Sequence, residues 1–301
     1  MMAVHPITAD AQGLQLSGGA DLRYQAESPG SDEAQVKGLF LNARKVLADA
    51  SGDRLILVGQ LDAENNFEDV RLYNTYAQLK GPLGHVNLRL GRYILPFGLL
   101  ANYDTERLLV QSLEPLSLGI KLDLGAQVLG YFGPLDYAVS VSQGTGKGVN
   151  DPDGNKLLTT RIGIQGENAR AGISYLNGQV VVDPDEFPVP GSFDRRRVAL
   201  DGEWSWQALT LRGELISGRD DGKAVSGGIL LADYELTPAW SLNTKLARWN
   251  GMIKQDDLIL GFSYRLPPGF VIRAAETYRR LDTADIRIFS LQLYWEFAHA
   301  L

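Results

Sequence analysis

The chain has 301 residues, of which 45% are hydrophobic and 22% charged, with a formal net charge of -7 and no cysteine. The acidic balance argues against a nucleic-acid-binding protein. The lack of cysteine excludes disulfides and covalent attachment of haem. No run approaches the roughly 18 to 20 apolar residues that a transmembrane helix needs, so we expect no helical membrane protein.

Apolar and polar residues alternate with a period of two along nearly the whole chain, which predicts strands. The alternation is clearest in residues 286–297, where Leu291 and Leu293 fall on one face and Gln292 on the other. Sixteen strands are predicted, at about 13–27, 34–49, 53–65, 69–81, 84–95, 119–132, 135–145, 156–166, 169–181, 195–206, 208–218, 224–237, 240–250, 254–266, 270–281 and 285–297.

The connections between these strands alternate in length. Those after even-numbered strands are tight and rich in turn-forming residues, whereas most of those after odd-numbered strands are longer and polar, such as GTGKGVNDPDGN and DPDEFPVPGSFD. Outer-membrane barrels show this asymmetry, with an even strand count and both termini in the periplasm. We therefore predict an all-β fold, a closed antiparallel transmembrane barrel of sixteen strands; the alternative is a soluble β-sandwich.

Three segments divide the chain. Residues 1–12 are predicted to form a periplasmic extension, residues 13–297 the barrel, and residues 298–301 a short tail after the last strand. The start of the chain has no basic region followed by an apolar core. Because a barrel must be exported, we expect the sequence to be a mature form with an added start.

Aromatic residues cluster beside the tight turns, as expected for a girdle at the periplasmic membrane interface. They are Tyr131, Phe132, Trp204, Trp206, Trp240, Tyr264, Phe270, Trp295 and Phe297.

The longest connection, residues 96–119, is too apolar for a loop in water, because it carries seven leucines. A long loop of this kind usually packs against other parts of the protein. We expect it to fold into the barrel and narrow the lumen, bringing Asp104, Glu106 and Arg107 near Arg89 or Lys121. An external flap or a contact between subunits is the alternative.

The segment LRLGRYILPFG, which ends at Gly98, resembles the phosphate-selective porin family, the group that contains porins O and P. In that family, a glycine and a PFG sequence precede a constricting third external loop. The segments ERLLVQSL and LDLGAQVLGYFG resemble the stretch after that loop, and RRRVALDGEW, LTLRGELISGRDD and LADYELTPAWSL resemble later hairpins. The resemblance covers most of the chain.

The resemblance implies a sixteen-stranded barrel in the outer membrane of a Gram-negative bacterium, a homotrimer surrounded by lipid, with passive diffusion of small polar or anionic solutes such as phosphate. Members that prefer phosphate line the pore with lysines and arginines. Here the third loop carries Asp104, Glu106 and Glu114 beside Arg107.

The polar parity of the strands places many charged residues in the lumen, where cationic rings favour anions and carboxylates favour cations. A slight excess of cations favours a weak anion preference. Many of these charges should be neutralised across strands, as with Arg212 and Glu203 or Asp201. The predicted pore-lining and constriction residues are Arg89, Arg92, Asp104, Glu106, Arg107, Lys121, Asp123, Arg161, Arg197, Arg212 and Arg273.

No catalytic or metal-binding pattern appears, so we expect no enzyme activity, no cofactor and no metal. The histidines His5, His85 and His299 lie far apart in the sequence, and GTGKG lacks the spacing of a phosphate-binding loop. The main alternative to a porin is a structural barrel that sheaths or anchors a partner protein, such as a multihaem cytochrome in an electron conduit. An open channel formed by the purified protein alone would separate the two.

Overall fold

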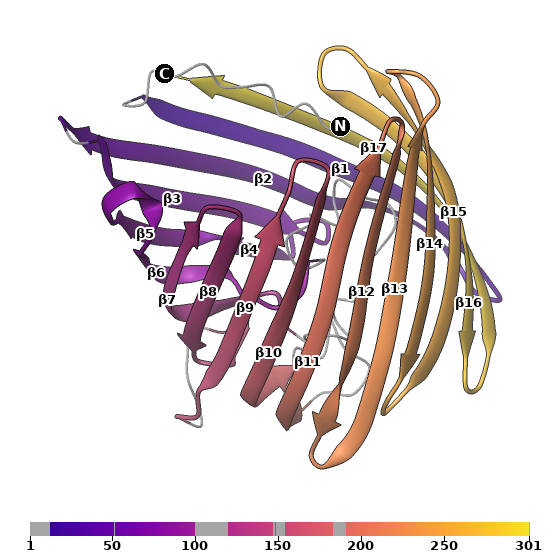
Figure 1. Ribbon diagram of the computed structural model, residues 1–301. Coiled ribbons are helices and arrows are strands. Elements are labelled where there is room, and N and C mark those ends of the chain that lie inside the picture. Colours follow the sequence, from indigo (N-terminus) through magenta and orange to yellow (C-terminus); the bar gives the residue numbers. More distant parts are fainter. Residues whose placement is uncertain are drawn as a thin grey trace.

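In the computed structural model, all strands belong to one antiparallel sheet that closes on itself (Figure 1). The structure describes residues 13–50, 52–99, 120–146, 148, 154–182 and 191–300. The strands are β1 (Leu14–Ser28), β2 (Asp32–Asp49), β3 (Gly52–Glu64), β4 (Asp69–Leu72), β5 (Thr75–Lys80), β6 (Asn87–Ile94), β7 (Leu122–Phe132), β8 (Leu135–Ser142), β9 (Leu157–Gln165), β10 (Ala169–Val182), β11 (Gly191–Trp206), β12 (Leu209–Asp220), β13 (Lys223–Glu235), β14 (Trp240–Asn250), β15 (Lys254–Leu266), β16 (Phe270–Leu281) and β17 (Asp285–Ala300).

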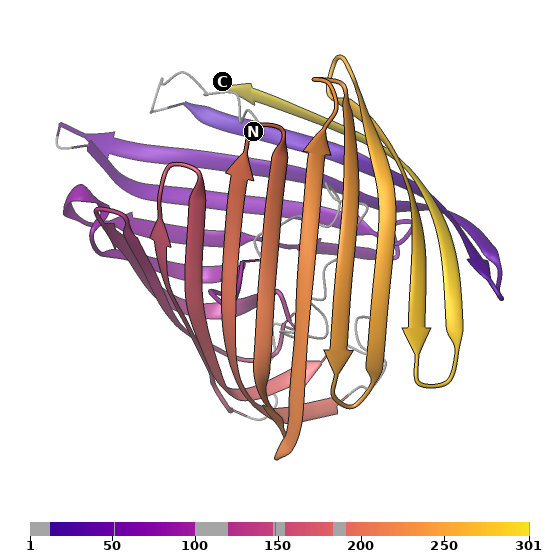
Figure 2. The same ribbon diagram turned by 45° about the vertical axis from the view of Figure 1, so that its right-hand side comes forward.

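The predicted count of sixteen strands is confirmed, although the sheet contains seventeen labelled segments. β4 and β5 both pair with β3 and occupy one strand position, interrupted at residues 73–74. Each strand pairs with its neighbours in the sequence, and β1 also pairs with β17 from Gln15↔Ala300 to Ser28↔Arg287. This pairing closes the barrel, as Figure 2 shows for the adjacent β1 and β17. A closed barrel leaves no unpaired edge strand.

The last strand is longer than we predicted. β17 continues to Ala300, so residues 298–300 of the expected tail belong to the barrel wall. The physical reason lies in β1, which begins at Leu14 and supplies hydrogen-bonding partners for Ala298, His299 and Ala300. A strand continues while a neighbouring strand offers paired backbone groups.

One end of the barrel, here called the turn end, carries the start of β1, the end of β17 and tight connections such as residues 133–134 and 207–208. The other end, the loop end, carries the connections between β6 and β7, β8 and β9, and β10 and β11. The predicted difference in connection length holds for these three connections. The other loop-end connections β12–β13, β14–β15 and β16–β17 are short and span only residues 221–222, 251–253 and 282–284.

Aromatic side chains gather at the turn end, as predicted. Trp204 stacks on Trp206, and Trp240 lies 4.4 Å from Tyr264 between ring centroids. Across the last hairpin, Phe270 contacts Trp295, which contacts Phe297. Trp204, Trp206, Trp240, Phe270 and Phe297 are exposed, so these aromatic side chains form a band on the outer face at this end of the barrel.

The two faces of the sheet differ in chemistry. Leucine, valine, isoleucine and aromatic side chains dominate the exposed outer face, whereas most buried charged side chains point inward. In β17, Leu291 and Leu293 are 42% and 40% exposed, whereas Gln292 between them is 0% exposed. The inward and outward parity predicted for this strand is confirmed. No helix among the described residues is long and apolar enough to span a membrane.

Candidate functional site: the barrel lumen

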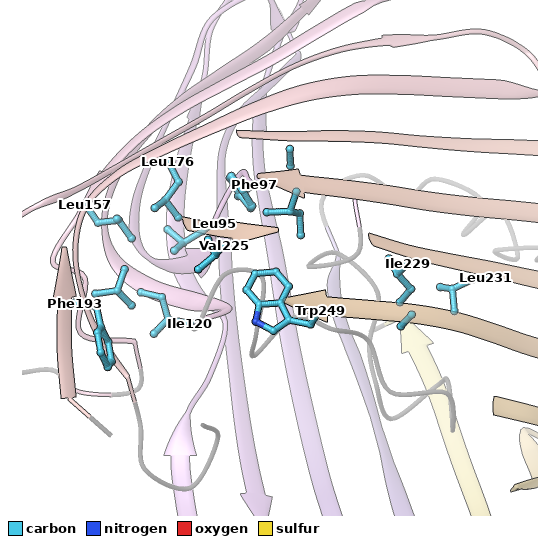
Figure 3. Packing of buried hydrophobic residues seen from close by; sticks show 14 of the residues in the cluster. Leu95, Phe97, Ile120, Leu157, Leu176, Phe193, Val225, Ile229, Leu231 and Trp249 are labelled. Atoms are coloured by element: carbon cyan, nitrogen blue, oxygen red, sulfur yellow. The ribbon is translucent and has the colours of Figure 1, made fainter. Parts of the chain in front are cut away.

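An apolar patch lies on the inner wall near the loop end, where the alternation had predicted mainly polar side chains. It belongs to a cluster that also contains Leu95 and Phe97, just after β6 (Figure 3). The wall residues of this patch come from β9 to β14 and include Leu157, Leu176, Val180, Phe193, Ile216, Val225, Ile229 and Trp249. Exposing these apolar side chains to luminal water would cost free energy, so their burial by Leu95 and Phe97 is favourable.

The chain leaves β6 toward the inside of the barrel. The N–H of Leu95 still donates to the carbonyl oxygen of Lys121, at 3.0 Å. Beyond it, Leu95, Phe97 and Leu99 are almost completely buried. The side chains at the beginning of residues 96–119 are therefore packed within the barrel rather than in external solvent.

Two backbone contacts tie this segment to the opposite part of the wall. The N–H of Gly98 donates to Oγ of Ser174 in β10, at 2.9 Å, and the N–H of Leu99 donates to Oε2 of Glu214 in β12, at 3.0 Å. Gly98 has φ +67, and a Cβ there would lie 2.3 Å from Glu214. The positive φ favours glycine, and a larger residue there would also displace the Glu214 carboxylate.

Of the predicted constriction residues, Asp104, Glu106 and Arg107 lie outside the described residues. The described residues of this loop, 96–99, lie inside the barrel. Lys121, on the other side of the loop, is partly buried.

Arg92 and Asp123 hold the beginning of the β8–β9 connection. Arg92 donates to the carbonyl oxygens of Leu72 and Gly146, at 3.2 and 2.5 Å. The buried carboxylate of Asp123 accepts hydrogen bonds from the N–H groups of Leu124 and Gly144, at 2.9 and 2.5 Å. Both side chains, which we had assigned to the pore lining, bind backbone groups of the wall and its loops.

Arg161 and Arg212 stand in ladders of alternating charge along the inner wall. Arg161 lies 2.9 Å from Asp136 and 2.6 Å from Asp201. Arg212 lies 2.6 Å from Glu203, as the sequence predicted, and also contacts Asp233. Charge-assisted hydrogen bonds of this kind fix side chains in one orientation.

Arg197 is part of a buried cluster at the loop end that the sequence did not predict. Arg195 Nε and Arg197 Nη2 both donate to the Asp220 carboxylate, at 3.1 and 2.5 Å. The guanidinium of Arg197 also lies 4.9 Å from the ring centroid of Trp249. Because we had ended the strand at residue 218, Asp220 was left outside it; extending the parity of Glu214 by six residues would have found it.

Arg89 and Arg273 have a different environment. Arg89 donates to the side-chain oxygen of Gln78, at 2.8 and 3.0 Å, and its guanidinium lies 4.3 Å from the ring centroid of Tyr76. Arg273 donates to the side-chain oxygen of Gln292, at 2.9 Å. Neither forms an ion pair with a carboxylate among the residues that the structure describes.

The predicted site residues are thus distributed around the inner wall rather than gathered at one point. Most of the luminal cations are bound to carboxylates, whereas Arg89 and Arg273 are bound to neutral glutamines. Sequence reasoning missed Ser174 and Glu214 as contacts of the long loop. Their inward parity was visible, but no sequence signal indicates which wall residues a folded-in loop will touch.

No protein-family model and no curated protein sequence matches the chain. Solved porin structures do match it over almost their whole length. The anion-selective porin from Comamonas acidovorans has a TM-score of 0.68 at 13% identity, with 94% of this chain and 99% of that chain covered. OmpF of Salmonella typhi, in complex with daunomycin, gives 0.74 at 11% identity, with 96% and 99% covered.

OmpT of Vibrio cholerae, an outer membrane protein solved in a trimer form, gives a TM-score of 0.74 at 8% identity, with 94% of this chain and 99% of that chain covered. Identities this low carry information about architecture alone. The chain therefore has the fold of the Gram-negative porins, a closed antiparallel barrel of sixteen strands.

Proposed function

We propose that this protein is a porin of the Gram-negative outer membrane, through which small polar solutes diffuse passively. The observation that carries the proposal is the division of one closed sheet into an apolar outer face and an inner face rich in paired charges. Lipid satisfies the outer face, and only a water-filled lumen satisfies the charged inner face. A trimer is part of the proposal, supported by the resemblance of the LRLGRYILPFG segment to a trimeric family.

The proposed channel prefers anions weakly. Arg89 and Arg273 support this preference, because glutamine partners leave the full positive charge of each guanidinium in the lumen. Phosphate is the anion to test first, since the planar arginine fork matches it and the motifs resemble those of phosphate-selective porins.

Reversing either charge should shift the selectivity toward cations. In planar bilayers under a salt gradient, we expect Arg89→Glu and Arg273→Glu to move the reversal potential toward the cation side, because fixed charges lining a pore set its selectivity. Arg196→Glu is the matched control, since Arg196 lies on the exposed outer face. A shift in the control, or none in the two luminal variants, would contradict the assignment.

We also propose that the loop of residues 96–119 narrows the lumen. Its first residues support this role, because Phe97 and Leu99 are buried and Leu99 binds the β12 wall through Glu214. A sixteen-stranded barrel with no loop inside it would enclose a wide aqueous channel. The loop would therefore set the size limit for solutes.

Deleting residues 100–113 should raise the single-channel conductance severalfold while the barrel still forms. The strands pair through their own backbone groups, so the wall does not depend on this segment. Conductance is measured in planar bilayers, and barrel formation by the shift in gel mobility on heating. A folded deletion variant with unchanged conductance would show that the narrowest point lies elsewhere.

The basic function has its own test. Purified protein should form open, ohmic channels in a bilayer without any partner. If the barrel conducts only after a coloured co-purifying protein has been removed, the result would instead favour a structural barrel that sheaths a multihaem cytochrome.

A further inference from the structure

Three arginines on the inner wall share an arrangement that Arg161 and Arg212 lack. Each lies directly opposite a glutamine of the neighbouring strand, and the register partners are Gln15↔Arg44, Gln78↔Arg89 and Arg273↔Gln292. In each pair the guanidinium donates to the side-chain oxygen of the glutamine, at 3.0 Å from Arg44, 2.8 and 3.0 Å from Arg89, and 2.9 Å from Arg273. Glutamine thus fixes the position of each arginine without neutralising its charge.

The neighbouring strand on the other side of each arginine is also uncharged at that level. The register partners there are Arg44↔Val58, Arg89↔Gln127 and Ser263↔Arg273. In the part of the chain that the structure describes, none of the three arginines forms an ion pair with a carboxylate. Each guanidinium therefore lies between two neutral side chains.

The three pairs lie on one contiguous part of the wall, because β16, β17, β1, β2, β3, β5 and β6 are neighbours in the sheet. We call this part of the wall the glutamine arc. Gln15 is the second residue of β1, Arg89 the third of β6 and Arg273 the fourth of β16, and all three strands begin at the turn end. The glutamine arc therefore lies beside the mouth of the lumen at the turn end.

The carboxylates near these pairs do not balance the arginines. Asp21 and Glu296 act electrostatically on Arg273. Asp21 already binds Arg23 at 2.6 Å, and Glu296 accepts a hydrogen bond from the hydroxyl of Tyr294 at 3.2 Å. These two acidic groups stand against four guanidiniums, those of Arg23 and of the three glutamine-bound arginines. An excess of positive charge remains on this side of the mouth.

The wall from β8 to β13 has the opposite balance near the turn end. Arg161, Arg170 and Arg212 each lie within 3.3 Å of a carboxylate. The carboxylates of these ion pairs outnumber the three arginines, and they belong to Asp136, Asp201, Glu203 and Asp233. The positive charge of the turn-end mouth is therefore concentrated on the glutamine arc.

We propose that the channel selects anions at its turn-end mouth, along the glutamine arc, and that Gln15, Gln78 and Gln292 are the positioning residues that make this possible. Fixed charges act on mobile ions within about one Debye length, roughly 10 Å at 0.1 M salt and 3 Å at 1 M. A glutamate in place of any of these glutamines would pair with its arginine and cancel the attraction. The inference rests on the proposed function for its open lumen.

The position of the charge predicts that selectivity depends on the direction of a salt gradient. In a planar bilayer with KCl, the attraction of chloride is strongest when the dilute solution bathes the turn-end mouth, because concentrated salt screens the arginines. We expect one inserted wild-type channel to give reversal potentials of different magnitude when the gradient is reversed by perfusion. Equal magnitudes in a conducting channel would overturn the proposal.

Variants of the glutamines connect this difference to the arc. Gln15→Glu, Gln78→Glu and Gln292→Glu should each lower the anion-to-cation permeability ratio and reduce the difference between the two reversal potentials. Gln78→Met keeps the charge of Arg89 but removes its hydrogen-bond acceptor, so we expect unchanged reversal potentials and a noisier open-channel current. Wild-type selectivity in all three glutamate variants, or an equal loss of selectivity in Gln78→Met, would contradict the assigned role.

Gln255→Glu is the matched control for position. Gln255 is the second residue of β15, which begins at the loop end, and its amide donates to the buried carboxylate of Asp257 at 2.9 Å. The same substitution there adds negative charge to the opposite end of the lumen. The difference between the two reversal potentials should then increase, whereas in Gln78→Glu it should decrease. An equal decrease in both variants would mean that selectivity follows the total luminal charge, which would overturn the proposal.

The channel and its selective mouth can fail separately. Folding of every variant is checked by the shift in gel mobility on heating. A wild-type channel that conducts with equal reversal potentials in both directions contradicts the turn-end site alone. A folded wild-type barrel that does not conduct contradicts the porin and the turn-end site together.

Discussion

Replacing Asp220 by asparagine is expected to lower the free energy of unfolding by about 3 to 5 kcal/mol. Asp220 forms ion pairs with both Arg195 and Arg197, and the three side chains are at most 2% exposed. Asparagine keeps the shape but leaves two buried guanidiniums without this negative charge. The measurement is urea-dependent folding into lipid vesicles, followed by tryptophan fluorescence.

Asp49→Asn is the control for this prediction. Asp49 also binds an arginine, Arg54, at 2.8 Å, but the two side chains are 53% and 52% exposed at a turn. Water replaces such a contact readily, so the expected loss is below about 1 kcal/mol. Similar losses for both substitutions would mean that the Asp220 cluster is hydrated in the folded barrel.

The strand count and the closure of the barrel could be predicted from the sequence because both depend on local patterns. Alternation with a period of two identifies each strand, and a slip of one residue would turn every leucine of the outer face inward. In β17, the parity of Leu291 and Gln292 was enough to assign both faces. The pairing of Arg212 with Glu203 followed from the same parity and a short hairpin.

The apolar patch inside the lumen could not be predicted in this way. Leu176 and Ile229 have inward parity, and a single strand does not reveal whether an inward leucine meets water or a loop. The answer depends on Phe97 and its neighbours, which approach from a distant part of the chain. Likewise, the role of Glu214 depends on the exact position of the Leu99 backbone, which parity cannot supply.

Sequence reasoning also placed charged residues in the lumen without distinguishing their environments. Arg273 and Arg197 have the same inward parity, yet one binds glutamine and the other a carboxylate. The difference depends on which side chain lies beside each arginine on the inner wall. In some cases that partner is two strands away. A selectivity prediction from a count of charges therefore needed the register of the folded sheet.

Replacing Leu291 by arginine is expected to destabilise the barrel by about 2 to 4 kcal/mol. Leu291 is exposed on the outer face of β17, four residues from the aromatic Trp295 toward the turn end and four from Arg287 toward the loop end. At about 3.4 Å per residue, this places it near the middle of the apolar band. An arginine there must either enter lipid or distort the surrounding bilayer.

Leu83→Arg provides the comparison, in the same vesicle-folding titration. Leu83 lies in the turn between β5 and β6 and is 78% exposed, so its arginine would reach water and headgroups. The depth dependence of such substitutions predicts a loss of about 0 to 1 kcal/mol at that site. A loss of only a few tenths for Leu291→Arg would mean that this face of β17 does not contact lipid. Equal large losses at both positions would instead indicate that each leucine is covered by protein, as at an interface between subunits.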